Sequence, residues 1–183
     1  MSQQNVERVR RGYDAWNRGE IEDLLESLHP DVEWLGHPQM PEPGPYRGRE
    51  AVERWIREFR DVWGEVTATP VEFVDAGDHV IVLVRMAGRG RGSGAEVAGG
   101  TDVHVWSFID AEICAFRIYQ GGDAAERAGL SPLEMDALRL CVADELGEAE
   151  VADRLDLSAA QVAGLVADSL GKLRGLAPAQ VAE

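Results

Sequence analysis

The sequence predicts an α+β fold in which three N-terminal helices pack on one curved antiparallel sheet, followed by a small all-α appendage. Three observations support this prediction. Up to residue 63, apolar residues recur every three or four positions, as they do on one face of a helix. Beyond Gly64 the apolar residues alternate with polar ones or run without a break, as they do in strands. After Gly121 and Gly122 the chain becomes alanine-rich, and its pattern is helical again.

The first helical region divides into three segments. Residues 5–17 carry apolar side chains at spacings of three and four, and an Asn-Arg-Gly-Glu sequence then ends this helix. A second, short helix is expected over 21–28, and the proline within His-Pro-Asp stops it. A short strand over 32–35 and a loop rich in proline and glycine over 36–48 come next. The third helix, over 50–63, places three aromatic residues at four-residue spacing.

A meander of antiparallel strands is expected after the third helix. One of these strands is an almost continuous β-branched run, which suits a strand buried on both faces. Asp110 and Ala111 form a tight turn between the last two strands. The strands are expected over residues 66–74, 79–86, 95–109 and 113–119.

The C-terminal region is expected to form a helical extension. Ser131 and Glu134 have the spacing of a capping box, with Pro132 at the first helical position. We place the domain division between residues 1–129 and residues 130–183. Helices of this region are expected over residues 124–128, 132–143, 148–155 and 159–173.

The chain of 183 residues is strongly acidic, with 33 Asp and Glu against 18 Lys and Arg and a formal net charge of -15. Such a charge repels polyphosphates and anionic membrane surfaces at long range, so we expect neither nucleic acid nor a membrane as a partner. Cys114 and Cys141 lie in apolar surroundings and are expected as free thiols in a reducing compartment. The chain starts without a signal-peptide pattern, and no apolar run reaches the ~20 residues that span a bilayer, so a cytoplasmic protein is expected.

Four motifs in the N-terminal region occur in order and at matching distances. They are residues 13–20 (YDAWNRGE), 28–34 (LHPDVEW), 46–52 (YRGREAV) and 104–108 (HVWSF). Through these motifs, residues 4–130 resemble the SnoaL-like, ketosteroid-isomerase-like branch of the nuclear-transport-factor-2-like superfamily. The resemblance implies a cone-shaped bent sheet around the helices, an apolar pocket at one end and a homodimer. Members of that superfamily include steroid isomerases, polyketide cyclases, epoxide hydrolases, dehydratases and proteins without activity, so the fold alone does not give the function.

His104 is the first candidate for chemistry. In the strand predicted over 95–109, Asp102, His104 and Trp106 share one face, because alternate residues of a strand point the same way. Polar groups beside aromatic rings are typical of a ligand pocket. In the similar steroid isomerases the position matching His104 holds a protonated aspartate that hydrogen-bonds the developing enolate, and histidine can donate in the same way or act as a base. The alternative is a core histidine bound to a backbone carbonyl.

His37, Tyr13 and Arg85 each have a functional and a structural interpretation. His37 lies near the place of the aspartate base in the similar isomerases; it either replaces that missing carboxylate or is a solvated loop residue. The tyrosine donor of those isomerases matches Gly12, and Tyr13 is rotated from that position by roughly 100°. Tyr13 therefore either reaches the pocket or packs in the core. Arg85 either binds a carboxylate or enolate, or lies at the rim or pairs with Asp102.

The candidate residues thus fall into two sets. The catalytic candidates are His104, His37, Tyr13 and Asp102. The expected ligand-binding residues are Trp16, Trp34, Trp55, Phe59, Arg85, Trp106 and Phe116. The aromatic residues among them either form a core or line a pocket for a flat aromatic ligand. No metal or cofactor is expected, because the four histidines lack zinc-motif spacing and no helix follows the glycines of 88–94 to bind phosphate.

Residues 130–174 resemble the helix-turn-helix domains of response regulators and of sigma-factor region four. The positions that usually carry basic, DNA-contacting side chains hold Ala163, Gly164, Leu165 and Asp168. From residue 131 onward the chain has ten acidic and four basic residues, a net charge of -6. We therefore expect this region to serve packing, dimerisation or closure of the pocket rather than DNA binding.

Together these patterns predict a small-molecule-binding homodimer whose ligand is an apolar compound with a carbonyl or hydroxyl group. As an enzyme, the protein would be a cofactor-free isomerase, cyclase or dehydratase that works by acid–base chemistry. The alternatives are a non-catalytic ligand sensor or accessory regulator whose helical extension contacts a protein partner, a silent scaffold, and a DNA-binding protein.

Overall fold

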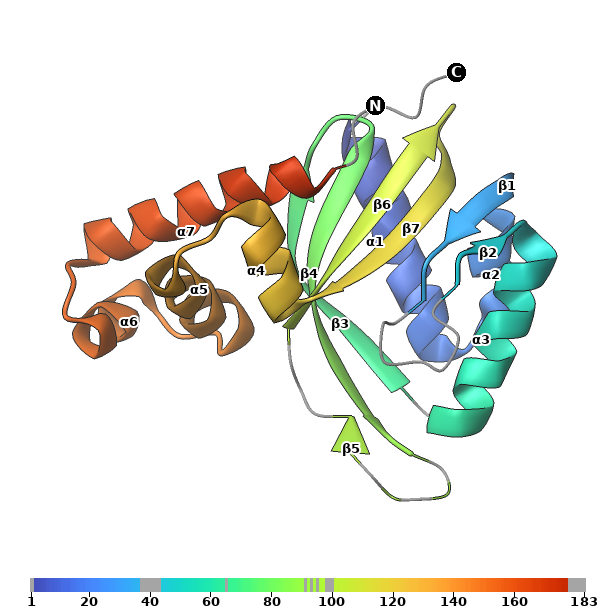
Figure 1. Cartoon of the computed structure of the whole chain (residues 1–183), viewed down its shortest axis with the longest axis horizontal. Helices are drawn as coiled ribbons and strands as arrows, with labels where there is room; N and C mark the ends of the chain where they lie inside the picture. The colour runs from blue at the N-terminus through green and yellow to red at the C-terminus, as the bar shows by residue number, and fades with distance from the viewer. Residues whose placement is uncertain are drawn as a thin grey trace. The chain divides into compact units, whose positions relative to one another are not determined.

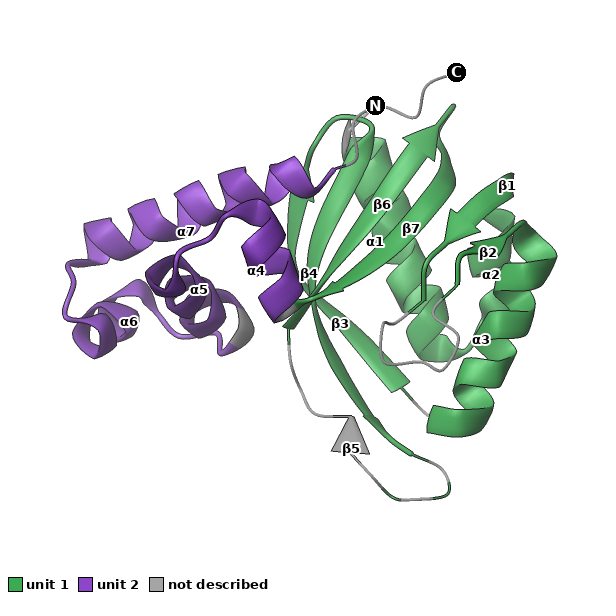
Figure 2. Cartoon of the chain, viewed as in Figure 1, with its two compact units in different colours: residues 1–120 green, residues 121–183 purple. Residues whose placement is uncertain are grey.

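A computed structural model describes residues 2–36, 44–64, 66–90, 92, 94, 96–97 and 101–177 of the chain. The chain consists of two compact units, Met1–Gln120 and Gly121–Glu183 (Figure 2). Each unit has a hydrophobic core of its own. The second unit begins where the alanine-rich composition begins. The expected division into domains of residues 1–129 and 130–183 stays a prediction.

The helices of the first unit are α1 (Ser2–Arg18), α2 (Ile21–Glu26) and α3 (Arg49–Trp63). The spacing of apolar residues predicted all of them. Of the aromatic residues at four-residue spacing in α3, Trp55 and Phe59 are buried, whereas the other buried residues, Val52 and Ile56, were not singled out in the sequence. α2 is shorter than expected, because Leu28 is the first residue of a strand and not the last of the helix.

Within the described residues, seven strands form one sheet. They are β1 (Leu28–Trp34), β2 (Tyr46–Arg47), β3 (Val66–Asp75), β4 (His79–Arg89), β5 (Glu96–Val97), β6 (Thr101–Ile109) and β7 (Glu112–Gln120). The order across the sheet is β2-β1-β7-β6-β4-β3, and β5 pairs with β4. β3, β4, β6 and β7 form the predicted antiparallel meander (Figure 1). The tight turn between β6 and β7 is confirmed, with positive φ angles at Asp110 and Ala111 that suit a two-residue hairpin.

The α+β class is confirmed, but two details of the sheet differ from the prediction. β1 pairs with β7 in parallel, so the sheet is not wholly antiparallel. β1 starts at Leu28 and runs through Pro30, where the sequence predicts a stop, and its register with β7 shifts before Glu33. Proline lacks a backbone N–H and is accommodated at such irregularities, as it also is at Pro70 of the edge strand β3. The strand predicted over 95–109 lies partly outside the described residues, of which Glu96–Val97 form β5 and Thr101–Ile109 form β6.

The helices α1 and α3 pack at opposite edges of this sheet. α1 contacts β3 and β4, whereas α3 contacts β1 and β2 (Figure 1). Side chains from both helices and from the strands join one hydrophobic core. The end of α1 is fixed by Asn17, whose Nδ2 donates to the Ala68 carbonyl and whose Oδ1 accepts from the Ala68 N–H, each at 2.9 Å. The central strands β7 and β6 thus lie between the two helix contacts.

The second unit is helical in its described part, as predicted. It contains α4 (Gly121–Ala128), α5 (Pro132–Leu138), the π-helical turn η1 (Arg139–Ala143), α6 (Glu148–Leu155), α7 (Ala159–Leu173) and the 3-10 turn η2 (Arg174–Leu176). The capping box of Ser131 and Glu134 is confirmed. A second one, of Ser158 and Gln161, starts α7 and was missed in the sequence. None of the helices in the described ranges is long and apolar enough to cross a membrane.

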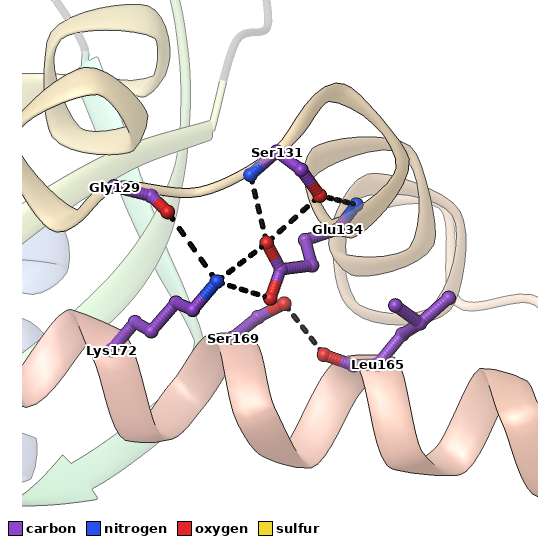
Figure 3. A network of polar contacts seen from close by, with 6 residues as sticks. All are labelled: Gly129, Ser131, Glu134, Leu165, Ser169 and Lys172. Carbon is purple, nitrogen blue, oxygen red and sulfur yellow. Dashed lines mark hydrogen bonds and ion pairs between the residues drawn. The ribbon is translucent and has the colours of Figure 1, made fainter.

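An ion pair inside the second unit joins the start of α5 to α7 (Figure 3). Lys172 Nζ lies 2.7 Å and 2.8 Å from the two carboxylate oxygens of Glu134. The backbone N–H and the hydroxyl of Ser131 donate to the same carboxylate. The hydrogen bond from Lys172, followed by those from Ser131, lowers the pKa of Glu134 from its ordinary 4.5 to about 2. The carboxylate is therefore charged, and holds the two helices together, over nearly the whole pH range.

Candidate functional site

An apolar cavity lies inside the first unit. The centres of water molecules could occupy about 50 Å³ of this cavity. At roughly 10–15 Å³ for each water, that is space for about three to five water molecules. Helices α1, α2 and α3 and the strands of the sheet supply its wall. The lining residues are Gly12, Tyr13, Trp16, Leu24, Trp34, Trp55, Phe59, Ala68, Met86, His104, Trp106, Phe116 and Ile118.

A row of three aromatic rings crosses the sheet at the base of this cavity. Trp34 of β1 and Trp106 of β6 are both register partners of Phe116 on the strand between them. The ring centroids of these partners lie 4.1 Å and 4.2 Å from that of Phe116. From α3, Trp55 packs against Trp34 at 5.7 Å and against Phe59 at 5.3 Å. Flat aromatic surfaces therefore make up most of the wall.

One hydrogen-bonded series of side chains lies among these rings. Trp106 Nε1 donates to the Tyr13 hydroxyl at 3.1 Å, and the same hydroxyl lies 2.8 Å from His104 Nδ1. All three residues are buried, with at most 4% of their surface exposed. Burial raises the pKa of Tyr13 far above its ordinary value, against the smaller lowering effect of the Trp106 hydrogen bond. The phenol is therefore protonated at every physiological pH.

This series assigns the protonation of the imidazole. An indole N–H only donates, so the Tyr13 oxygen accepts from Trp106 and is left with one proton of its own. If His104 Nδ1 also donated to that oxygen, the phenol proton would lack an acceptor among the described residues, at a cost of about 1–3 kcal/mol. We therefore assign the Tyr13 O–H as donor to Nδ1, which places the imidazole proton on Nε2. His104 in this form is neutral and presents an N–H donor.

The cavity brings together eight of the residues singled out in the sequence. They are Tyr13, Trp16, Trp34, Trp55, Phe59, His104, Trp106 and Phe116. Tyr13 reaches His104 although it is displaced by one residue from the tyrosine position of the similar isomerases, because it belongs to the buried face of α1 together with Val9 and Trp16.

The remaining predicted residues do not line the described part of the cavity. Arg85 lies on the face of β4 opposite to Met86, which does line it. Asp102 is buried and lies on the same face of β6 as His104, two residues before it, but it is not part of the wall. His37 lies outside the described residues.

Five lining residues were not proposed from the sequence. They are Gly12, Leu24, Ala68, Met86 and Ile118. The strand register was the signal that could have found three of them, because Ala68 pairs with Met86 and Ile118 pairs with His104. Such pairs share a face of the sheet. The register between neighbouring strands could not be obtained from the alternation of apolar and polar residues alone.

The polar inventory of the wall is small. Within the described residues, no group of three or more His, Cys, Asp or Glu side chains that could hold a metal ion occurs. Besides the Trp106–Tyr13–His104 series, the wall contains the indole N–H groups of Trp16, Trp34 and Trp55. Trp16 Nε1 donates to the Val66 carbonyl at 2.9 Å. The Nε1 atoms of Trp34 and Trp55 are buried without any hydrogen-bond acceptor.

Comparisons with known proteins agree on the first unit. A family model described as "SnoaL-like domain" matches residues 9–116. No curated protein matches the chain.

Three solved structures illustrate the similarity of the fold. An NTF2-like protein of unknown function from Burkholderia pseudomallei is 29% identical, with a TM-score of 0.60 over 71% of this chain and 98% of that one. TerC, co-crystallised with polyporic acid, is 25% identical, with a TM-score of 0.58 over 64% and 91% of the two chains. Bal32a from a soil-derived mobile gene cassette is 24% identical, with a TM-score of 0.59 over 65% and 90%, and supports the fold alone. Because the family model covers more than half of the sequence, the chain belongs to the SnoaL-like family within the NTF2-like fold.

Proposed function

We propose that the first unit binds an apolar carbonyl or hydroxyl compound in its cavity and acts on it by acid–base chemistry without a cofactor, with His104 as the proton donor. The single observation that carries this proposal is the Trp106–Tyr13–His104 series. It holds one neutral imidazole in one tautomer inside a wall of aromatic rings. TerC, a protein of the same fold, was co-crystallised with the organic compound polyporic acid, which supports a small-molecule ligand here too.

The geometry favours donation over base catalysis at His104. An imidazole whose Nδ1 accepts from Tyr13 carries its proton on Nε2, and an N–H there can stabilise the negative charge that develops on a carbonyl oxygen. The wall is lined mainly by apolar side chains, and a hydrogen bond formed in such surroundings is stronger than one in water. Enolisation of a carbonyl ligand develops an oxyanion of this kind: its α-proton passes to a solvent water or hydroxide ion, because the described wall holds no Asp or Glu, while the N–H of His104 hydrogen-bonds the oxygen. Tyr13 is a positioning residue in this scheme, because its contact is with His104.

Exchange of α-protons tests the catalytic part of this proposal. Acetophenone serves as a probe, because it has one carbonyl group on a flat ring, and its exchange in D₂O is followed by NMR. We expect the wild type to accelerate exchange and His104→Phe to abolish the acceleration. His79→Gln is the matched control: His79 is also buried, but bonds Ser107 on the opposite sheet face. Binding without any acceleration in the wild type would refute the catalytic role and leave a binding protein.

Tryptophan fluorescence tests the binding part. Several indoles line the cavity, so occupancy by acetophenone is expected to change their emission. Loss of one hydrogen bond in His104→Phe is expected to weaken binding about 2–12-fold. An unchanged affinity in this variant would show that the imidazole does not hold the carbonyl group.

A ligand sensor with a helical contact module is the second candidate function. α6 and α7 are joined by a short turn that passes through Asp156 in a left-handed conformation, and Ser158 caps the next helix. This is helix-turn-helix connectivity, but the chain from residue 131 onward has a net charge of -6. We infer contacts with protein rather than DNA, as well as a homodimeric state. Retention on a DNA column at moderate salt would contradict the first inference, and a monomer mass in analytical ultracentrifugation the second.

A further inference from the structure

Gly12 is a glycine in the interior of a helix, at a position where its backbone borders the cavity. It lies well inside α1, it is buried, and it belongs to the cavity wall. Glycine in a helix interior lowers stability relative to alanine, because it loses more conformational freedom when the chain folds. A positive φ angle or a close contact of the backbone is the common reason for a glycine at such a position.

Neither reason applies to Gly12. Its φ angle lies outside the positive region, unlike that of Gly19 just beyond the helix, which is 81°. Apart from its chain neighbours and the backbone of α1, the one described atom within 4 Å of a Cβ built on Gly12 is Leu24 Cδ1, at 3.4 Å. That distance is an ordinary van der Waals contact. Alanine would therefore fit at residue 12 without displacing a neighbour.

The space beside Gly12 is part of the cavity. Protein interiors are close-packed, so a Cβ at a buried position normally touches atoms on several sides. Here it would touch Leu24 alone among the described residues, because the cavity lies on the other sides. A methyl group is about as large as a water molecule, so alanine would remove the space of roughly one water from a cavity that holds about three to five.

The wall around Gly12 is apolar. Leu24 approaches it from α2, and Trp16 lies four residues further along α1, on the same face of the helix. Both residues line the cavity. The single N–H of Trp16 already donates to the Val66 carbonyl, so neither side chain has a hydrogen bond left for a ligand. This part of the wall suits an alkyl group.

We propose that Gly12 is a specificity-determining residue of the cavity: the side chain that it lacks leaves room for an alkyl substituent of the ligand. The substituent packs against Leu24 and Trp16, while the carbonyl oxygen of the same ligand binds His104. This selection by size rests on the proposed function, because it requires a ligand in the cavity.

Two ketones that differ only in an alkyl group test the role of Gly12 in the full-length protein. Acetophenone and 4-ethylacetophenone carry the same carbonyl group, and isothermal titration calorimetry measures their affinities. Each buried carbon of an alkyl group raises affinity about fourfold, so we expect the wild type to bind the ethyl compound about tenfold more tightly. In Gly12→Ala this preference should fall to about threefold or less, and in Gly12→Leu it should be reversed.

Gly164→Ala is the matched control. It makes the same substitution inside α7, at an exposed position where a Cβ would meet no described atom within 4 Å. Both alanine variants are expected to raise Tm by roughly 2–8 °C, because alanine favours the helix. Only Gly12→Ala should change the preference between the ketones. His104→Phe should weaken both ketones by the same factor and keep their ratio.

The possible results separate this inference from the proposed function. If the wild type binds both ketones and Gly12→Ala keeps their ratio, the role of Gly12 is overturned and the proposed function stands. A lower Tm in Gly12→Ala would also overturn that role, since it would show that packing requires the glycine. If the wild type binds neither ketone, both the role of Gly12 and the proposed function are wrong.

Discussion

Replacing Tyr13 with phenylalanine removes one oxygen atom and breaks two buried hydrogen bonds. The ring of the variant keeps the packing of Tyr13 against Phe73 and Trp106. The Trp106 N–H, at 3.1 Å, loses its acceptor, and His104 Nδ1, at 2.8 Å, loses its donor. Each lost bond is worth about 0.5–1.5 kcal/mol, and a stranded buried group costs about 1–3 kcal/mol. We expect Tyr13→Phe to lower the free energy of unfolding by about 2–3 kcal/mol.

Urea unfolding followed by tryptophan fluorescence measures this loss. A change of this size corresponds to a fall of Tm by roughly 4–12 °C for a chain of this length. Tyr119→Phe is the control, because it removes the same atom from a half-buried tyrosine. A Tyr13→Phe protein as stable as the wild type would refute the hydrogen-bonded series and, with it, the assigned tautomer of His104.

The stability of the protein at alkaline pH gives a second, independent test of the buried Tyr13 phenol. Because burial raises the pKa of Tyr13, the folded state keeps the phenol proton above pH 10 while the unfolded state releases it. The stability from this group is therefore complete below pH 10 and declines as the pH rises further. The gap between wild type and Tyr13→Phe should shrink by about 1.4 kcal/mol for each pH unit above 10. A gap that stays constant from pH 7 to pH 11 would contradict the buried, protonated phenol.

Three further outcomes follow from other contacts. Because Lys172 and Ser131 lower the pKa of Glu134 to about 2, this carboxylate stabilises the second unit above pH 4.5 and loses its effect as the pH falls towards 2. Helix content by circular dichroism should show a larger decline in the wild type than in Lys172→Met, in which only the Ser131 hydrogen bonds remain. Asn17→Ala should cost about 1–2 kcal/mol in urea unfolding, because it leaves the backbone of β3 without two hydrogen bonds. Gly36→Ala should displace the Trp55 ring, visible as a shift of its indole N–H signal in the protein without ligand.

Local periodicity was enough to predict the elements that depend on local patterns. The burial of Trp55 and Phe59 in α3 follows directly from aromatic residues at helical spacing. The parallel pairing of β1 with β7 could not be predicted in this way. These strands are far apart in the sequence, and a period of two residues indicates a strand without indicating its neighbour or its direction.

The same limit explains which site residues were placed in advance. Alternation along β6 put His104 and Trp106 on one face, and both line the cavity. β4 is buried on both faces over its first residues, so its apolar run gave no sign of which face carries the cavity. Arg85 could be assigned to the far face only once Met86 was seen in the wall. The contact between Tyr13 and His104 could not be predicted from the sequence either, because Tyr13 lies one residue away from the tyrosine position of the similar isomerases and its phenol still extends to His104.

The net charge of -15 and the uncharged cavity wall both disfavour an anionic ligand. The net negative charge of the chain repels an approaching anion over a screening distance of about 8–10 Å. An anion that overcame this barrier would find no lysine or arginine in the described wall. The long-range field and the short-range chemistry therefore select against the same class of molecule. A ligand that carries its negative charge only in the transition state avoids both penalties, and in the proposed function the N–H of His104 stabilises that charge as it forms.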